Sequence, residues 1–119
     1  MATPAFAIQA FGVYLLGLGA ILIVAPNALL SQFGMPPTEE VWIHVVGMLV
    51  AFLGFYYVRA AAAGLSAFFG WTVPVRLSVL AFFAAFVALL SAPPVLLLFG
   101  LVDAAAAIWT WRALRAGRR

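Results

Sequence analysis

Long apolar stretches, interrupted at only a few places by polar or charged residues, dominate the chain of 119 residues. They cover residues 6–25, 41–63, 72–92 and 95–113. Each stretch is close to the ~20 apolar residues that an α-helix needs to cross a hydrocarbon core about 30 Å thick. The pattern therefore predicts an all-α polytopic membrane protein with one transmembrane domain over residues 1–119, folded as an up-down four-helix bundle.

Three short segments connect the predicted helices. A loop over residues 31–40 follows the first helix, which is expected to end at Pro26. The apolar stretch 65–71 is too short to cross a membrane, so we expect it to lie in the interface before the third helix opens at Thr72. The connection 91–94 is so tight that the last two helices must be antiparallel neighbours.

The distribution of positive charge predicts the topology. The six basic residues are Arg59, Arg76, Arg112, Arg115, Arg118 and Arg119. With an even number of crossings, both termini and the middle loop share one side of the membrane, and every arginine lies on that side. The positive-inside rule makes this side the cytoplasm. We expect all six side chains to contact lipid headgroups, including Arg76, which would extend from the start of the third helix.

Composition supports a membrane protein and narrows its chemistry. The chain is 68% hydrophobic and 8% charged, which excludes a soluble domain. Its net charge of +3 comes from helix ends, so it does not indicate nucleic-acid binding. Arginine without lysine, with abundant Ala and Gly, is typical of a GC-rich bacterial genome and predicts the bacterial inner membrane. With no cysteine there is no thiol chemistry.

Small residues mark the faces on which the helices are expected to pack, because the hydrophobic effect cannot drive association inside a membrane. They are Gly12 and Gly19; Gly47, Ala51 and Gly54; Ser78, Ala81, Ala85, Ala88 and Ala92; and Gly100, Ala104 and Ala107. Close approach of the backbones at these positions would make a compact bundle.

A weak internal repeat is visible along the chain. Gly47, Tyr56 and Arg59 have the same spacing as Gly100, Trp109 and Arg112. A tandem pair of hairpins related by an axis along the membrane normal would produce this pattern. Apolar helices that end in aromatic and basic anchors would produce it as well, so both origins remain open.

Asp103 is the main candidate for a functional site. It lies near the middle of the last helix, at the depth of the bilayer midplane, where a carboxyl group is costly unless it faces protein or water. Tyr14 is the expected hydrogen-bond partner, whereas Arg76 and Arg59 are expected at the rim, out of reach. His44 would meet Asp103 only through water or a ligand. Asp103 is either a proton or cation site or a structural hydrogen bond that sets helix register.

Other polar and aromatic residues offer less chemistry. His44 has Glu40 and Glu39 nearby, which is too few ligands for a metal, so a capping or interfacial role is expected. Four aromatic residues, Tyr56, Tyr57, Trp109 and Trp111, form either interface anchors or a wall for a lipophilic ligand. No nucleophile lies beside a base, and no phosphate-binding loop is present. We therefore predict no enzymatic activity, no cofactor and no metal.

In size, topology and Gly/Ala-rich pattern the chain resembles the small uncharacterised bacterial membrane proteins that include DoxX-like proteins. That resemblance implies a place beside membrane oxidoreductase assemblies in some cases. The chain is also similar in architecture to small multidrug resistance transporters, which work as dimers. Those transporters depend on a glutamate in the first helix, and this first helix has no acidic residue.

Two functions follow from these observations. The first is a non-enzymatic bundle that binds a lipophilic ligand or packs into a larger membrane complex as an accessory subunit. The second is a small homodimeric proton-coupled transporter in which Asp103 is the coupling acid, since four helices alone are few to enclose a path. Beyond the lipid bilayer, the expected partners are a second copy or a larger complex.

Overall fold

A computed structural model describes residues 3–116 and is all-α over that range. Its helices are α1 (Pro4–Val24), α2 (Pro26–Gln32), α3 (Trp42–Ala63), α4 (Ser66–Leu90) and α5 (Leu96–Ala116). All but the short α2 are long and apolar enough to cross a membrane. The prediction of an all-α chain with four candidate membrane helices is confirmed.

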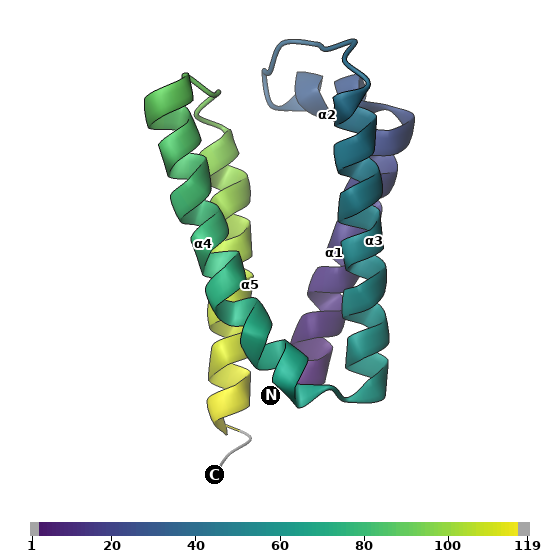
Figure 1. The fold of residues 1–119 in the computed structure, drawn as a ribbon, viewed down its shortest axis with the longest axis vertical. Helices are drawn as coiled ribbons and strands as arrows, with labels where there is room; N and C mark the ends of the chain where they lie inside the picture. Colours follow the sequence, from purple (N-terminus) through teal and green to yellow (C-terminus); the bar gives the residue numbers. More distant parts are fainter. Residues whose placement is uncertain (1–2, 117–119) are drawn as a thin grey trace.

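The four long helices form two antiparallel hairpins (Figure 1). α1 packs on α3, and α4 packs on α5. The described ends of the chain and the α3–α4 connection lie at one end of the molecule, and α2 lies at the other (Figure 1). We call the first of these the basic end, because Arg59, Arg112 and Arg115 lie in the parts of α3 and α5 that reach it. α4 leans toward the first hairpin where it begins and moves away from it toward Leu90 (Figure 1).

The short helix α2 replaces part of the predicted loop. Pro26 does end α1, but it also begins α2, since proline is well suited to the first position of a helix. The loop after α2 is held by Asn27, whose side chain donates a hydrogen bond to the Thr38 carbonyl at 3.0 Å and accepts one from the Thr38 N–H at 2.8 Å. The chain between the first two long helices is therefore a folded cap over one end of the α1–α3 hairpin.

The largest difference from the sequence prediction concerns α4. The stretch 65–71 was expected to lie along the interface, but from Ser66 it forms the start of α4, which continues through Pro74 to Leu90. Proline removes the helical donor to the Gly70 carbonyl, yet an apolar environment favours a continuous helix because it leaves backbone groups few other partners. The Thr72 hydroxyl donates to the Phe69 carbonyl at 2.7 Å and supports this turn. Arg76 consequently lies well inside α4, about 15 Å from its start.

Glycines let α1 and α3 pack backbone against backbone. A Cβ atom on Gly19 would lie 2.7 Å from the Gly47 carbonyl oxygen, and one on Gly47 would lie 2.9 Å from the Gly19 oxygen. Two turns away, a Cβ atom on Gly54 would lie 2.8 Å from the Gly12 oxygen. These separations are too short for any side chain, so the predicted packing role of the four glycines is confirmed.

A buried apolar cluster lies where the two hairpins meet. Its members come from α1, α3 and the first turn of α4: Ile8, Phe11, Leu15, Tyr57, Ala60, Ala61 and Phe69. Phe69 belongs to the segment that was predicted to be interfacial, and its burial ties the start of α4 to the first hairpin. Two members of this cluster, Phe11 and Tyr57, also face the buried side chain of Arg76 on α4.

Candidate functional site

Arg76 is the most deeply buried charged side chain in the described chain, with 2% of its surface exposed. Its Nη2 atom donates to the Thr72 hydroxyl and to the Thr110 hydroxyl, each at 2.9 Å. Its Nε atom donates to the Thr72 carbonyl at 3.3 Å. Thr72 lies one turn earlier on α4 and Thr110 lies on α5, so Arg76 joins these two helices.

Two aromatic rings from the other hairpin face the Arg76 guanidinium. Its Cζ atom lies 4.7 Å from the centroid of Phe11 on α1 and 5.7 Å from that of Tyr57 on α3. Cation–π contacts of this kind are worth about 2 kcal/mol when water is excluded. All four long helices therefore meet at one cation.

One guanidinium nitrogen of Arg76 has no partner. Among the described residues, Nη1 of Arg76 is the buried side-chain polar atom for which the structure shows no hydrogen bond. Leaving a buried donor unsatisfied costs about 1 to 3 kcal/mol, and more for a charged group. A hydrogen-bond acceptor delivered to Nη1 would recover this free energy.

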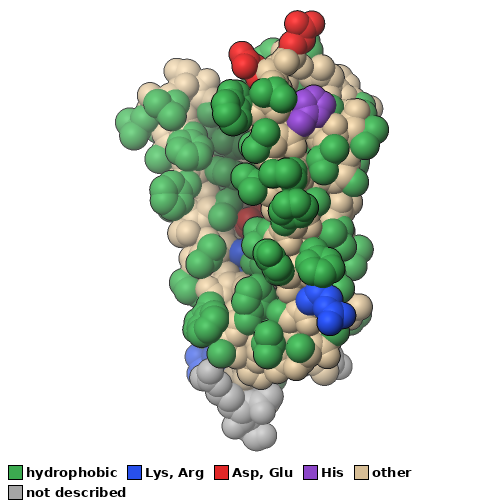
Figure 2. Space-filling view, turned by 45° about the vertical axis from the view of Figure 1, so that its right-hand side comes forward, with side chains coloured by type: hydrophobic (Ala, Val, Ile, Leu, Met, Phe, Trp, Pro, Cys, Tyr) green, Lys and Arg blue, Asp and Glu red, His purple; other side chains and the backbone are tan. Residues whose placement is uncertain are grey.

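Asp103 lies within electrostatic reach of Arg76, Tyr14 and Tyr57. Its side chain is half-buried, as predicted for a carboxyl group that faces protein. Within residues 3–116 it makes no hydrogen bond and no ion pair as close as 4.0 Å with Arg76. Figure 2 shows an acidic and a basic side chain next to each other, recessed among hydrophobic side chains midway along the molecule. The two opposite charges are thus neighbours, and Nη1 of Arg76 still has no hydrogen-bond partner in the described structure.

Arg76 lies near Asp103, although Tyr14 was the predicted partner. Tyr14 is half-buried and its ring packs on Phe11 at 5.4 Å, but no hydrogen bond joins it to Asp103 in the described structure. Arg76 was expected at the membrane rim, out of reach and contacting headgroups, and that expectation is wrong. The reason is the earlier start of α4, which moves Arg76 inward and lets Thr110 hold it.

His44 lies at the opposite end of the molecule from the basic end, in the first turn of α3. Its exposed ring places Nδ1 2.7 Å from the Ile23 carbonyl, one of the last carbonyls of α1. A proton on Nδ1 makes this a hydrogen bond that caps the helix. The capping role expected for His44 fits this geometry, and His44 does not join the Asp103 site.

The aromatic and basic anchors divide into surface and interior residues. Tyr56 is 62% exposed, and Trp109 and Trp111 are also exposed, as interface anchors would be. Tyr57 is 3% exposed and lies against Arg76, so of its two predicted roles the interface anchor does not fit, and the wall for a lipophilic ligand stays a prediction. The exposed arginines are Arg59, Arg112 and Arg115. Arg118 and Arg119 lie outside the described residues.

The sequence contained a signal for this site that was not used. Thr72 and Arg76 are one helical turn apart, and Asp103 and Thr110 are two turns apart, so each pair shares a helix face. Two polar faces on antiparallel neighbours predict a polar contact between α4 and α5. Phe11 and Tyr57 carried no such signal, since aromatic residues are common in any apolar helix.

The site offers binding chemistry. It holds one unsatisfied donor on Arg76, one carboxylate acceptor on Asp103 and apolar walls. Within the described residues no group of three or more His, Cys, Asp or Glu could hold a metal ion. The arrangement suits a ligand with a small polar head and an apolar body.

Comparison with protein-family models, with curated proteins and with solved structures gives no match for this chain. The resemblance to DoxX-like proteins therefore stays a prediction.

Proposed function

We propose that this protein is a small non-enzymatic membrane protein that binds a lipophilic molecule between its two hairpins, with the head of the ligand at Arg76 and Asp103. The observation that carries the proposal is the buried Nη1 atom of Arg76, which has no partner in the described structure. An intramembrane ionisable group is costly and usually functional. A bound acceptor removes that cost, and the aromatic rings of Phe11 and Tyr57 that face Arg76 suit an apolar ligand.

The charges of the site define the head of the ligand. Arg76 and Asp103 carry opposite formal charges, so together they favour a neutral group over an ion. A hydroxyl or carbonyl head accepts from Nη1 of Arg76, and a hydroxyl can also donate to Asp103. The proposed ligand is an uncharged lipophile with such a head.

A second protein could supply the same group. If a helix of a larger membrane complex brings a hydroxyl or carbonyl to Arg76, the protein is an accessory subunit of that complex. This version also fits a DoxX-like relationship. In this version the group that binds Arg76 belongs to a protein partner and not to a small lipophilic ligand.

Native mass spectrometry of protein released gently from its membranes tests the proposal. We expect the wild-type protein to retain a lipophilic mass or a partner subunit, and Arg76→Gln to lose it. Arg59→Gln is the matched control because Arg59 is exposed and lies outside the site. A bare wild-type monomer would contradict the proposal, and so would equal retention by Arg76→Gln. If Arg76→Gln does not fold, Asp103→Asn removes the other half of the site.

Proton-coupled transport by a homodimer is the second candidate. It is favoured by the Asp103 carboxylate, which makes no hydrogen bond in the described structure and is only half-buried. Such a group can gain and lose a proton more readily than one fixed in a network. Asp103→Asn should then abolish pH-dependent uptake in proteoliposomes, and unchanged uptake would exclude this mechanism.

We further propose that the protein lies in a bacterial inner membrane with both termini in the cytoplasm, which the arginines at the basic end favour. The chain has no cysteine, so single cysteines can report orientation. An impermeant maleimide should label Ser31→Cys, after the first long helix, in intact spheroplasts. It should label Ala116→Cys only after lysis, and the reverse pattern would overturn the orientation.

A further inference from the structure

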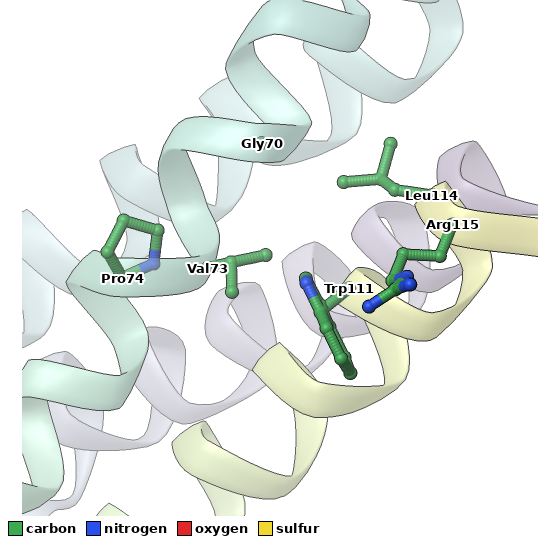
Figure 3. A pocket seen from close by; sticks show the side chains of 6 residues that line it. All are labelled: Gly70, Val73, Pro74, Trp111, Leu114 and Arg115. Carbon is green, nitrogen blue, oxygen red and sulfur yellow. The ribbon is translucent and has the colours of Figure 1, made fainter. Parts of the chain in front are cut away.

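A groove opens on the surface at the basic end, between the start of α4 and the end of α5. It is lined by Gly70, Val73, Pro74, Trp111, Leu114 and Arg115 and encloses about 240 Å³. Figure 3 shows Val73 and Leu114 on facing helices, with Trp111 and Arg115 beside them. We propose that this basic groove binds the headgroup of an anionic phospholipid, independently of the site at Arg76.

Arg115 provides the charged contact. Its Cζ atom lies 5.0 Å from the Trp111 ring centroid, so the ring supports the guanidinium at the mouth of the groove. A guanidinium presents two parallel donors to a phosphate, and tryptophan is the residue most typical of headgroup depth. The pair thus combines phosphate recognition with the correct depth.

The groove walls provide room and an acceptor. Gly70 has no side chain, and a Cβ atom placed there would meet nothing within 4 Å. Because Pro74 has no N–H, the Gly70 carbonyl lacks its usual helical donor and can accept from a hydroxyl group of the lipid. A headgroup with a phosphate and a glycerol hydroxyl, as in phosphatidylglycerol, meets both requirements.

The charge around the groove selects an anionic lipid. Arg59, Arg112 and Arg115 are exposed at this end of the described chain. Two of the three acidic residues, Glu39 and Glu40, lie near α2 at the opposite end, and Asp103 lies inside α5. Since no acidic side chain of the described residues lies beside these arginines, a lipid with net negative charge is favoured over a zwitterionic one.

Native mass spectrometry with added lipid tests this proposal. Purified protein is mixed with phosphatidylglycerol, phosphatidylcholine or inorganic phosphate, and the bound masses are counted. We expect one phosphatidylglycerol to be retained more strongly than phosphatidylcholine, and inorganic phosphate not to displace it. Arg115→Gln should weaken retention about fivefold, the equivalent of about 1 kcal/mol for one basic residue near the surface. Gly70→Leu, which fills the groove, should weaken it as well.

Arg59→Gln is the matched control, because it removes an exposed arginine of the same end that does not line the groove. It should retain the lipid. Equal losses for Arg59→Gln and Arg115→Gln would show non-specific attraction and overturn the proposal. Equal retention of phosphatidylcholine, displacement by inorganic phosphate, or full retention by Gly70→Leu would overturn it too. Each variant is compared at matched helical circular dichroism, so that unfolding is not counted as loss of the site.

Discussion

The two hairpins are built differently although both are pairs of apolar helices. α1 and α3 interlock through reciprocal glycine contacts, and the charged groups of this pair lie near its ends. α4 and α5 approach closely at Gly100, which faces Leu80, and they carry Arg76 and Asp103 well inside the helices. The first hairpin packs backbone against backbone and carries no charged side chain well inside its helices, whereas the second carries Arg76 and Asp103 there.

Arg76 connects the two hairpins. It comes from α4, donates to Thr110 on α5 and lies against Phe11 and Tyr57 of the first hairpin. The first hairpin thus provides the aromatic surface on which the cation of the second hairpin is held.

The largest expected effect comes from breaking the glycine interlock. Gly19→Leu places a side chain against the backbone of Ala51 and Gly47, so α1 and α3 must separate. We expect a loss of about 3 kcal/mol in the free energy of unfolding. Gly17→Leu is the control on the same helix, since a Cβ atom there meets nothing within 4 Å. Thermal unfolding in detergent measures the stability of both variants. Similar melting temperatures for Gly19→Leu and Gly17→Leu would contradict the close glycine packing of α1 on α3.

The next effect tests the charges of the second hairpin. Arg76→Gln should lower the free energy of unfolding by about 2 kcal/mol, because hydrogen bonds from a charged donor are lost. Asp103→Asn should cost less, since Asp103 makes no hydrogen bond in the described structure. If the two charges interact, the double variant differs from the sum of the single ones by about 0.5 kcal/mol or more. Strict additivity in this double-mutant cycle would show that the charges do not act as a pair.

A smaller effect is expected at Thr110. Thr110→Val removes the side-chain acceptor that ties α5 to Arg76 and keeps the shape of the residue, which should cost about 1.5 kcal/mol. Thr110→Ser retains the hydroxyl and should retain most of the stability. Denaturation monitored by tryptophan fluorescence compares them. Equal stability of the Val and Ser variants would show that the Thr110 hydroxyl does not stabilise the contact between α5 and Arg76.

The smallest effect concerns the end of the molecule that holds α2. Phe33, just after α2, and Phe99 on α5 stack edge to face with centroids 5.1 Å apart, which joins the hairpins far from Arg76. Phe33→Ala should cost about 1 kcal/mol, the value of an aromatic pair. Amide hydrogen exchange should rise at the start of α5 and not at the basic end. An increase spread over the whole chain would indicate a general loss of stability instead.

The existence of the four long helices was predictable and most of their bounds lie close to the predicted ones, but the start of α4, expected at Thr72 and found at Ser66, was not predicted. Mean apolarity over about 20 residues decides whether a segment can cross a membrane, and that quantity is local. Whether residues 65–71 join α4 depends on the burial of Phe69 against the first hairpin and on the hydroxyl of Thr72, which are contacts made after folding. The wrong start of this helix led directly to the wrong position of Arg76.

By itself, the sequence determined four apolar helices, the gathering of arginines toward one end and the glycine faces of the first two long helices, because hydropathy, charge and residue size are properties of each segment alone. It also singled out Asp103 from its depth in an apolar stretch. Only the tertiary structure decided that Arg76 and Tyr57 are interior residues and that Nη1 of Arg76 has no partner in the described chain. Those facts depend on the rotation and offset of one helix against another, which the packing of all four long helices sets together.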